Sequence, residues 1–119
     1  MNEREKVRDF LKLVKTTIEN PVAGEAWVLV PRQENFNCIL ELGFKNRDIK
    51  ETLLGLSVED YSEGPCFDRD QPGELWVFGK SIENKTVYIK IKLASFSALK
   101  MVRVISFHFA EHPLDYPLK

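Results

Sequence analysis

The chain has 119 residues, 44% of them hydrophobic and 29% charged, and its 17 Lys and Arg residues nearly balance its 18 Asp and Glu residues. A chain of this length can bury one core without disulfides, and Cys38 and Cys66 stand in no redox or metal-binding pattern. No stretch reaches the roughly 18 apolar residues of a membrane span. We therefore expect one cytoplasmic domain over residues 1–119, with no metal, no cofactor and no membrane.

The first part of the chain, residues 1–55, is predicted to be mainly helical. Apolar residues recur at helical spacing, and Pro or Gly follows the predicted ends. The predicted helices cover residues 3–20, 35–42 and 46–55. Between the first two, Gly24 opens a β-type run over residues 26–30, which is either a short strand or a buried extended segment.

The second part of the chain predicts a sheet. Residues 56–73 are rich in turn-forming residues and predict a turn and an irregular loop. In residues 74–108 the apolar residues alternate, which predicts three antiparallel strands, and the connectors 81–86 and 94–99 have hairpin length. Residues 109–119 form a C-terminal tail. The expected fold is α+β, with N-terminal helices packed on one face of a C-terminal antiparallel β-meander.

The lengths of the two connectors suggest a register with Lys80 opposite Thr86 and Leu93 opposite Met101. One face of the sheet is then an apolar layer for the helices, with Arg103 as its exception: Leu75, Val77, Val87, Ile89, Ile91, Leu93, Met101, Ile105 and Phe107. The other face gathers cationic, aromatic and hydroxyl side chains: Trp76, Phe78, Lys80, Tyr88, Lys90, Lys92, Ser106 and His108.

The second set has side chains that suit single-stranded RNA. Lysines contact phosphates, aromatic rings stack on bases, and a histidine or tyrosine can transfer protons. Plainer interpretations stay open. Alternating lysines are typical of a solvent-facing strand, and a helix or the tail could cover Trp76 and Phe78. His108 and His112 could both be ordinary surface histidines.

The formal net charge of −1 conceals two opposed parts of the chain. Residues 79–119 hold seven basic and three acidic residues, a balance of +4, whereas residues 1–78 hold ten basic and fifteen acidic residues, a balance of −5. The basic part contains most of the predicted sheet. The near-neutral total therefore does not exclude a nucleic-acid partner.

Four ordered blocks within residues 33–108 resemble a known family. They are Gly55–Tyr61 (GLSVEDY), Leu75–Lys80 (LWVFGK), Val87–Ile91 (VYIKI) and Val104–His108 (VISFH). These blocks resemble the motility quorum-sensing regulator (MqsR) family, RNA-cleaving toxins of bacterial type II toxin–antitoxin systems with a RelE-like fold. The resemblance implies an endoribonuclease, or mRNA interferase. Its implied partners are messenger RNA and a cognate antitoxin protein, with the ribosome as an open alternative.

Matched block by block, the resemblance places the family's catalytic tyrosine at Tyr88 and puts His108 where the family has a lysine. Several other RelE-like ribonucleases use a histidine near the C-terminus for proton transfer. Trp76-Val77 stands where the family's best-known form has a Trp-Gln pair. Ser62-Glu63-Gly64 stands where it has a further lysine. The expected site therefore follows the family pattern at one position and departs from it at three.

RNA cleavage without a metal needs a base for the 2′-hydroxyl proton, a cation for the charge that grows at phosphorus, and an acid for the leaving 5′-oxygen. We expect His108 to act as acid or base, because an ordinary histidine has a pKa of about 6.5. Tyr88 is expected to orient or transfer a proton, and Lys90 and Lys80 to stabilise the phosphate. The expected RNA contacts are Lys92, Arg103, Trp76 and Phe78.

Two other classes of function fit the same pattern. One is a non-catalytic domain of the same fold that binds RNA or protein. The other is a small-molecule-binding α+β domain, although the sequence has no Gly-rich phosphate loop.

Overall fold

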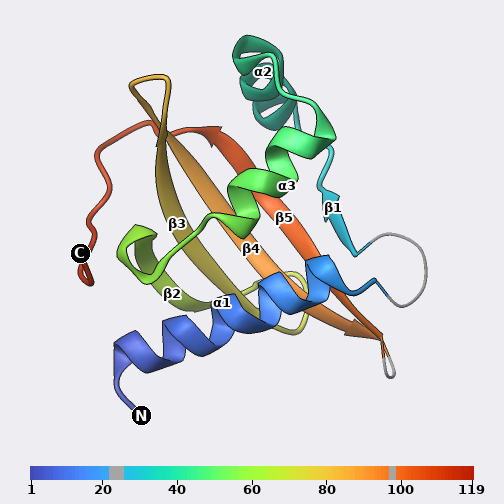
Figure 1. The fold of residues 1–119 in the computed structure, drawn as a ribbon, viewed down its shortest axis with the longest axis vertical. Helices are drawn as coiled ribbons and strands as arrows, with labels where there is room; N and C mark the ends of the chain where they lie inside the picture. The colour runs from blue at the N-terminus through green and yellow to red at the C-terminus, as the bar shows by residue number, and fades with distance from the viewer. Residues whose placement is uncertain (22–25, 97–98) are drawn as a thin grey trace.

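The computed structural model describes residues 1–21, 26–96 and 99–119, and these residues form helices packed on a mixed β-sheet (Figure 1). The helical elements are α1 (Glu3–Glu19), α2 (Gln33–Leu42), α3 (Asn46–Leu54) and the 3₁₀ turn η1 (Val58–Asp60). The strands are β1 (Trp27–Leu29), β2 (Tyr61–Phe67), β3 (Glu74–Ile82), β4 (Lys85–Phe96) and β5 (Leu99–Phe109). Within the described residues, no helix has the length and apolarity needed to cross a membrane.

The three predicted helices are confirmed to within two residues at each end. The side chain of Asn2 accepts a hydrogen bond from the Glu5 N–H and so caps α1. Gly43 ends α2 with a φ of 69°, a left-handed conformation that favours glycine. The apolar stripe of α1 is buried against the sheet: Val7, Leu11, Val14 and Ile18.

The sheet has the strand order β1-β5-β4-β3-β2, in which β1 runs parallel to β5 and the other pairs are antiparallel. The α+β class is confirmed, but two strands join the predicted meander. The run at 26–30 supplies β1. The prediction of an irregular loop from Tyr61 onward is wrong, because residues 61–67 pair with β3 as an edge strand with two register shifts. Gly24 and residues 97–98 lie outside the described residues.

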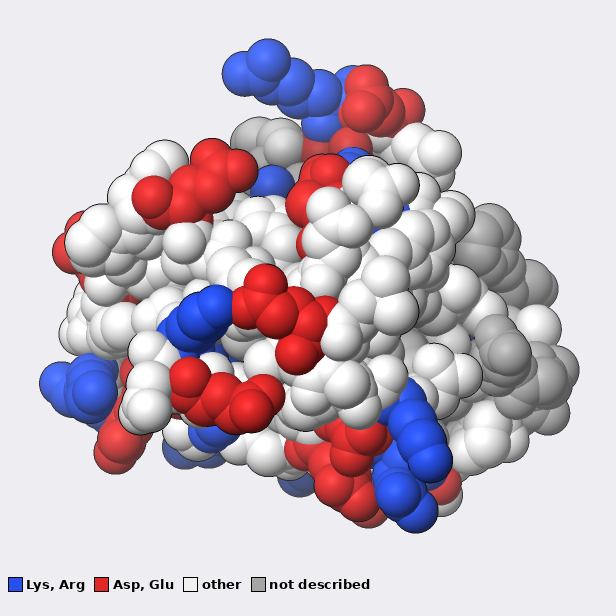
Figure 2. Space-filling view, turned by 90° about the horizontal axis from the view of Figure 1, so that it is seen from above, with Lys and Arg blue, Asp and Glu red and all other residues white. Residues whose placement is uncertain are grey.

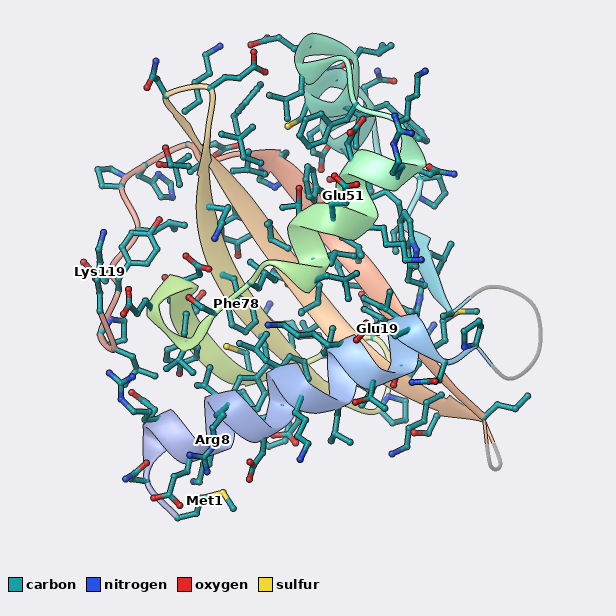
Figure 3. All side chains as sticks on the ribbon, viewed as in Figure 1. Met1, Arg8, Glu19, Glu51, Phe78 and Lys119 are labelled. Carbon is teal, nitrogen blue, oxygen red and sulfur yellow. The ribbon has the colours of Figure 1, made fainter. Side chains whose placement is uncertain are left out.

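The two faces of the sheet differ in what covers them. α1 and α3 cross one face, here called the helix face (Figure 1). Its buried side chains come from β3, β4 and β5: Trp76, Phe78, Val87, Ile89, Ile91, Val102, Val104 and Phe107. The opposite face, here called the open face, carries Val77, Gly79, Tyr88, Lys90, Lys92, Arg103, Ser106 and His108. Figure 3 labels Phe78 on β3, which is fully buried in the core, and Glu51 on α3.

The predicted register of β3 is wrong by one residue. Lys80 lies opposite Val87 rather than Thr86, because Glu83 and Asn84 form a two-residue turn in which both have positive φ, 51° and 66°. A shift of one residue turns a whole strand over. Trp76 and Phe78 therefore lie on the helix face, 8% and 0% exposed, and stack on Phe10 of α1.

A β-bulge interrupts β5 beside the predicted site. Ile91 lies opposite Val104, whereas Lys90 lies opposite Ser106, so Ile105 is an extra residue on β5. Such an extra residue changes which side chains reach each face of a sheet. Val104 and Phe107 consequently both reach the helix face, while Ser106 and His108 reach the open face.

Candidate active-site pocket

A pocket of about 310 Å³ opens on the open face where β4, β5 and the tail meet. Strands β4 and β5 contribute Tyr88, Lys90, Ser106 and His108, the tail contributes Glu111, His112 and Leu114, and Arg32 comes from the start of α2. The pocket thus gathers three of the four residues predicted as catalytic: Tyr88, Lys90 and His108.

His108 and Tyr88 form the floor of this pocket as a stacked pair. They lie directly opposite each other on β5 and β4, with ring centroids 5.2 Å apart and ring planes 17° from parallel. The Nδ1 of His108 is 3.0 Å from the carbonyl oxygen of Phe109. A carbonyl can only accept, so Nδ1 carries the hydrogen in the neutral ring. The lone pair is then on Nε2, which is the form a general base needs.

Lys90 and the Tyr88 hydroxyl add further polar groups to the pocket. The Lys90 Nζ is 5.8 Å from the centroid of the Tyr88 ring, and among the described residues Lys90 takes part in no ion pair. Burial raises the pKa of Tyr88 above its usual value of about 10, and the negative charge of Glu63 adds to this. Tyr88 therefore stays protonated at neutral pH and can donate a hydrogen bond.

The pocket also contains residues that the sequence pattern did not identify. Arg32 is the N-cap residue of α2, and Glu111 and His112 are on the tail. The chain has two histidines, and both line this one pocket. The signal in the sequence was their spacing of four residues, since a chain that turns back after His108 can return His112 to the same place.

Two lysines predicted to meet RNA are held by carboxylates elsewhere. Lys80 is on the helix face, where its Nζ lies 3.1 Å from Asp60 and 3.3 Å from the carbonyl oxygen of Gly55. Lys92 is on the open face but only 4% exposed, because its Nζ lies 3.0 Å from Asp68 in the loop between β2 and β3. The structure therefore does not place either lysine in the pocket.

The remaining RNA contacts predicted from the sequence are also outside the pocket. Arg103 lies opposite Lys92, nearer the start of β5 than the pocket residues Ser106 and His108. Trp76 and Phe78 are buried in the core and present no ring for a base to stack on. The expectation that they share a face with Tyr88 is wrong, for the reason of register given above.

The basic balance of residues 79–119 is largely compensated in the folded protein. Three of its seven basic residues pair with acids from residues 1–78: Lys80 with Asp60, Lys85 with Glu41, and Lys92 with Asp68. Figure 2 shows acidic and basic side chains interspersed over the face seen from above. The cationic groups that reach the pocket are thus few and local, Lys90 and Arg32, rather than part of a broad basic field.

The C-terminal tail closes one side of the pocket because it is attached at several points. The Ala110 N–H donates to the Thr86 carbonyl over 2.9 Å, and Arg4 of α1 donates to the Leu118 carbonyl over 2.8 Å. Between these points, Leu114 and Tyr116 lie against Gly79 on the open face, where a Cβ would stand 2.7 Å from the Leu114 Cδ1. Gly79 therefore leaves room for the tail.

Cys38 lies outside this pocket, and its thiol is not activated. Burial, and next the negative charge of Glu41, raise the pKa of the Cys38 thiol to about 11, so it is a poor nucleophile. In the described part of the chain, no three His, Cys, Asp or Glu side chains are placed to hold a metal ion together.

No protein-family model matches the chain, and neither the curated proteins nor the solved structures give a match.

Proposed function

We propose that this chain is a toxin-type endoribonuclease that cleaves single-stranded RNA by metal-independent acid–base catalysis at the pocket of Tyr88, Lys90 and His108. The observation that carries the proposal is the stacked His108–Tyr88 pair beside Lys90 in one pocket. A base, a hydrogen-bond donor and a cation are the groups that this reaction uses.

In the proposed reaction, the Nε2 of His108 takes the proton of the 2′-hydroxyl. The 2′-oxygen then forms a bond to phosphorus, and the bond from phosphorus to the 5′-oxygen breaks. Lys90 stabilises the negative charge that grows on the phosphorane, and the protonated Tyr88 hydroxyl donates to a phosphate oxygen. The products are a 2′,3′-cyclic phosphate and a 5′-hydroxyl.

The leaving 5′-oxygen needs a proton, and we assign this role to His112. A general acid works best when its pKa lies near the operating pH, which suits a histidine better than Tyr88 with its raised pKa. Arg32 also lines the pocket, and we assign to it the binding of a flanking phosphate.

The biological setting belongs to the same proposal. The four sequence blocks support an MqsR-like toxin with a cytoplasmic address and an antitoxin partner. The order of helices followed by a meander supports a RelE-like architecture.

The test is cleavage of a fluorogenic single-stranded RNA by purified protein in the presence of EDTA. We expect His108→Ala to lower kcat by about 100-fold or more with unchanged stability, and His112→Ala to remove one limb of the pH profile. The control is Lys100→Ala, since Lys100 is exposed on β5 away from the pocket. Undiminished cleavage by His108→Ala would remove His108 from the mechanism.

A non-catalytic RNA-binding domain is the second candidate, favoured by the ion pair with Asp60 that keeps Lys80, an expected catalytic residue, out of the pocket. The two functions separate in one experiment, because a binding domain retains RNA without forming a cyclic phosphate. In a cell, growth arrest on expression that the product of an adjacent reading frame relieves would support the toxin, and its absence together with intact RNA binding would support the second candidate.

A further inference from the structure

Asn35, on the first turn of α2, is fully buried and makes three hydrogen bonds to backbone, two of them to β5 and one to the residue that follows β1. Its Nδ2 donates to the carbonyl oxygens of Val30, at 3.0 Å, and of Ile105, at 3.1 Å. Its Oδ1 accepts from the Phe107 N–H at 2.8 Å. Every polar atom of this side chain therefore faces β5 or the end of β1.

These bonds reproduce the pattern of a parallel β-ladder. In such a ladder, one residue donates to the residue before its partner and accepts from the residue after it. The Asn35 amide donates to Ile105 and accepts from Phe107, so it is paired as a strand residue would be with Ser106. The backbone pairing of β1 with β5 ends just before these bonds. Its last hydrogen bond is from the Val30 N–H to the Val104 carbonyl, over 2.9 Å.

The side chain thus takes the place of a strand at the bulge of β5. Along an unbulged strand, alternation from Val104 would place Ser106 and His108 on the helix face. The extra residue Ile105 returns both to the open face, where Ser106 lies opposite Lys90 and His108 opposite Tyr88. Lys90 on β4 pairs with Ser106 on one side of the bulge. On the other side, Asn35 is hydrogen-bonded to Ile105 and Phe107.

We propose that Asn35 is a positioning residue for the pocket, holding Ser106 and His108 in register with Lys90 and Tyr88 through the bulge backbone. As a catalytic statement this rests on the proposed function, but the positioning itself is a property of the fold. Asn35 does not reach the pocket, since its polar atoms are all used by the backbone.

The experiment compares Asn35→Ala and Asn35→Gln with the wild-type protein. In Asn35→Ala, we expect the NOE contacts between the Tyr88 and His108 rings to weaken and the exchange of the Phe107 amide to accelerate more than that of Phe78. We expect kcat on RNA to fall by about tenfold or more, with a smaller change in KM, because displacement of a catalytic group by about 1 Å has effects of this size.

Asn35→Gln covers the case in which Asn35→Ala does not fold. It keeps the donors and the acceptor but adds a methylene, so it should fold and still lower kcat. The control is Leu53→Ala on α3, a truncation of a fully buried residue that makes no hydrogen bond to the bulge, which should lower stability and leave the ring contacts and kcat unchanged.

The proposal is overturned if the ring contacts persist in a folded Asn35 variant, or if Asn35→Ala and Leu53→Ala change kcat equally. If the wild-type protein cleaves no RNA, the proposed function fails. The ring contacts and the Phe107 exchange rate still decide the role of Asn35 in that case.

Discussion

The helix face and the open face of the sheet are made by the same strands, yet different interactions hold their side chains in place. On the helix face, many apolar residues pack together in one core. Phe10 stacks on Trp76 there, with ring centroids 4.5 Å apart. On the open face, single contacts determine each position: the stacking of His108 on Tyr88, and the ion pair of Lys92 with Asp68. Substitutions should therefore affect stability on the first face and geometry on the second.

The largest effect on stability is expected from Phe78→Ala on the helix face. Phe78 is fully buried, and its removal deletes contacts with Phe10 and Tyr61 and leaves a cavity. We expect the free energy of unfolding, measured by urea denaturation, to fall by about 3–5 kcal/mol. Leu40→Ala is the control, since Leu40 on α2 is 78% exposed and should change stability by less than about 0.5 kcal/mol. A loss below about 1 kcal/mol for Phe78→Ala would contradict the comparison.

Alternation of apolar and polar residues predicted the residues of the helix face correctly where only one of the two alternate sets along a strand is apolar. Val87, Ile89 and Ile91 of β4 are on the predicted face. On β3, consecutive residues are apolar, so the sequence does not show which alternate set faces the helices. The assignment of faces therefore depended on the geometry of the turn between β3 and β4. The positive φ angles of Glu83 and Asn84 define a two-residue turn. The length of the connector alone did not distinguish this turn from one that shifts the register by one residue.

On β5, two shifts of one residue in the same direction add up to two residues, which restores the predicted face at the site. The predicted pairing of Leu93 with Met101 is wrong by one, since Leu93 lies opposite Val102, and this explains both the misplaced Arg103 and the valines expected on the polar face. The bulge at Ile105 then adds a second shift. His108 is therefore on the open face as predicted, although the register that led to this prediction was wrong.

Other parts of the site had no local signal in the sequence. Asn35 precedes its partners on β5 by 70 residues or more, so only the folded chain brings them together. The same is true of Arg32, which enters the pocket from the start of α2. Hydrophobic periodicity predicts the face of an element but does not predict which distant side chain meets it.

The ion pair of Lys92 and Asp68 is expected to make stability depend on pH. Hydrogen bonds from the Asp70 N–H, and next from Lys92, lower the pKa of Asp68 in the folded protein. Its contribution is therefore full above the unfolded pKa of about 3.9 and is lost as the pH falls through the lower folded pKa. Lys92→Met keeps most of the side-chain volume and removes the Lys92 part of this effect.

We expect the free energy of unfolding of the wild-type protein to fall more steeply than that of Lys92→Met as the pH decreases below about 4. Urea denaturation at a series of pH values measures both slopes. Lys100→Met is the control, because Lys100 is exposed and makes no ion pair within the described residues. Parallel curves for the wild type and Lys92→Met would show that the pair does not hold the loop.

The smallest effect on global stability is expected from Gly79→Ala, which tests whether the tail belongs to the open face. The added Cβ would meet the Tyr116 hydroxyl and the Leu114 Cδ1, both at the ends of side chains, so the tail moves and the strand does not. We expect hydrogen exchange to increase in residues 111–119 and to stay unchanged in β3 and β4, with a loss in unfolding free energy of about 1 kcal/mol or less.

Tyr116→Phe in the same protein removes the nearest atom and should partly restore the protection. Because Glu111, His112 and Leu114 line the pocket, release of the tail is expected to lower the proposed RNA cleavage while the His108–Tyr88 stacking persists. If exchange in the tail is unchanged, its contact with Gly79 does not hold the pocket wall.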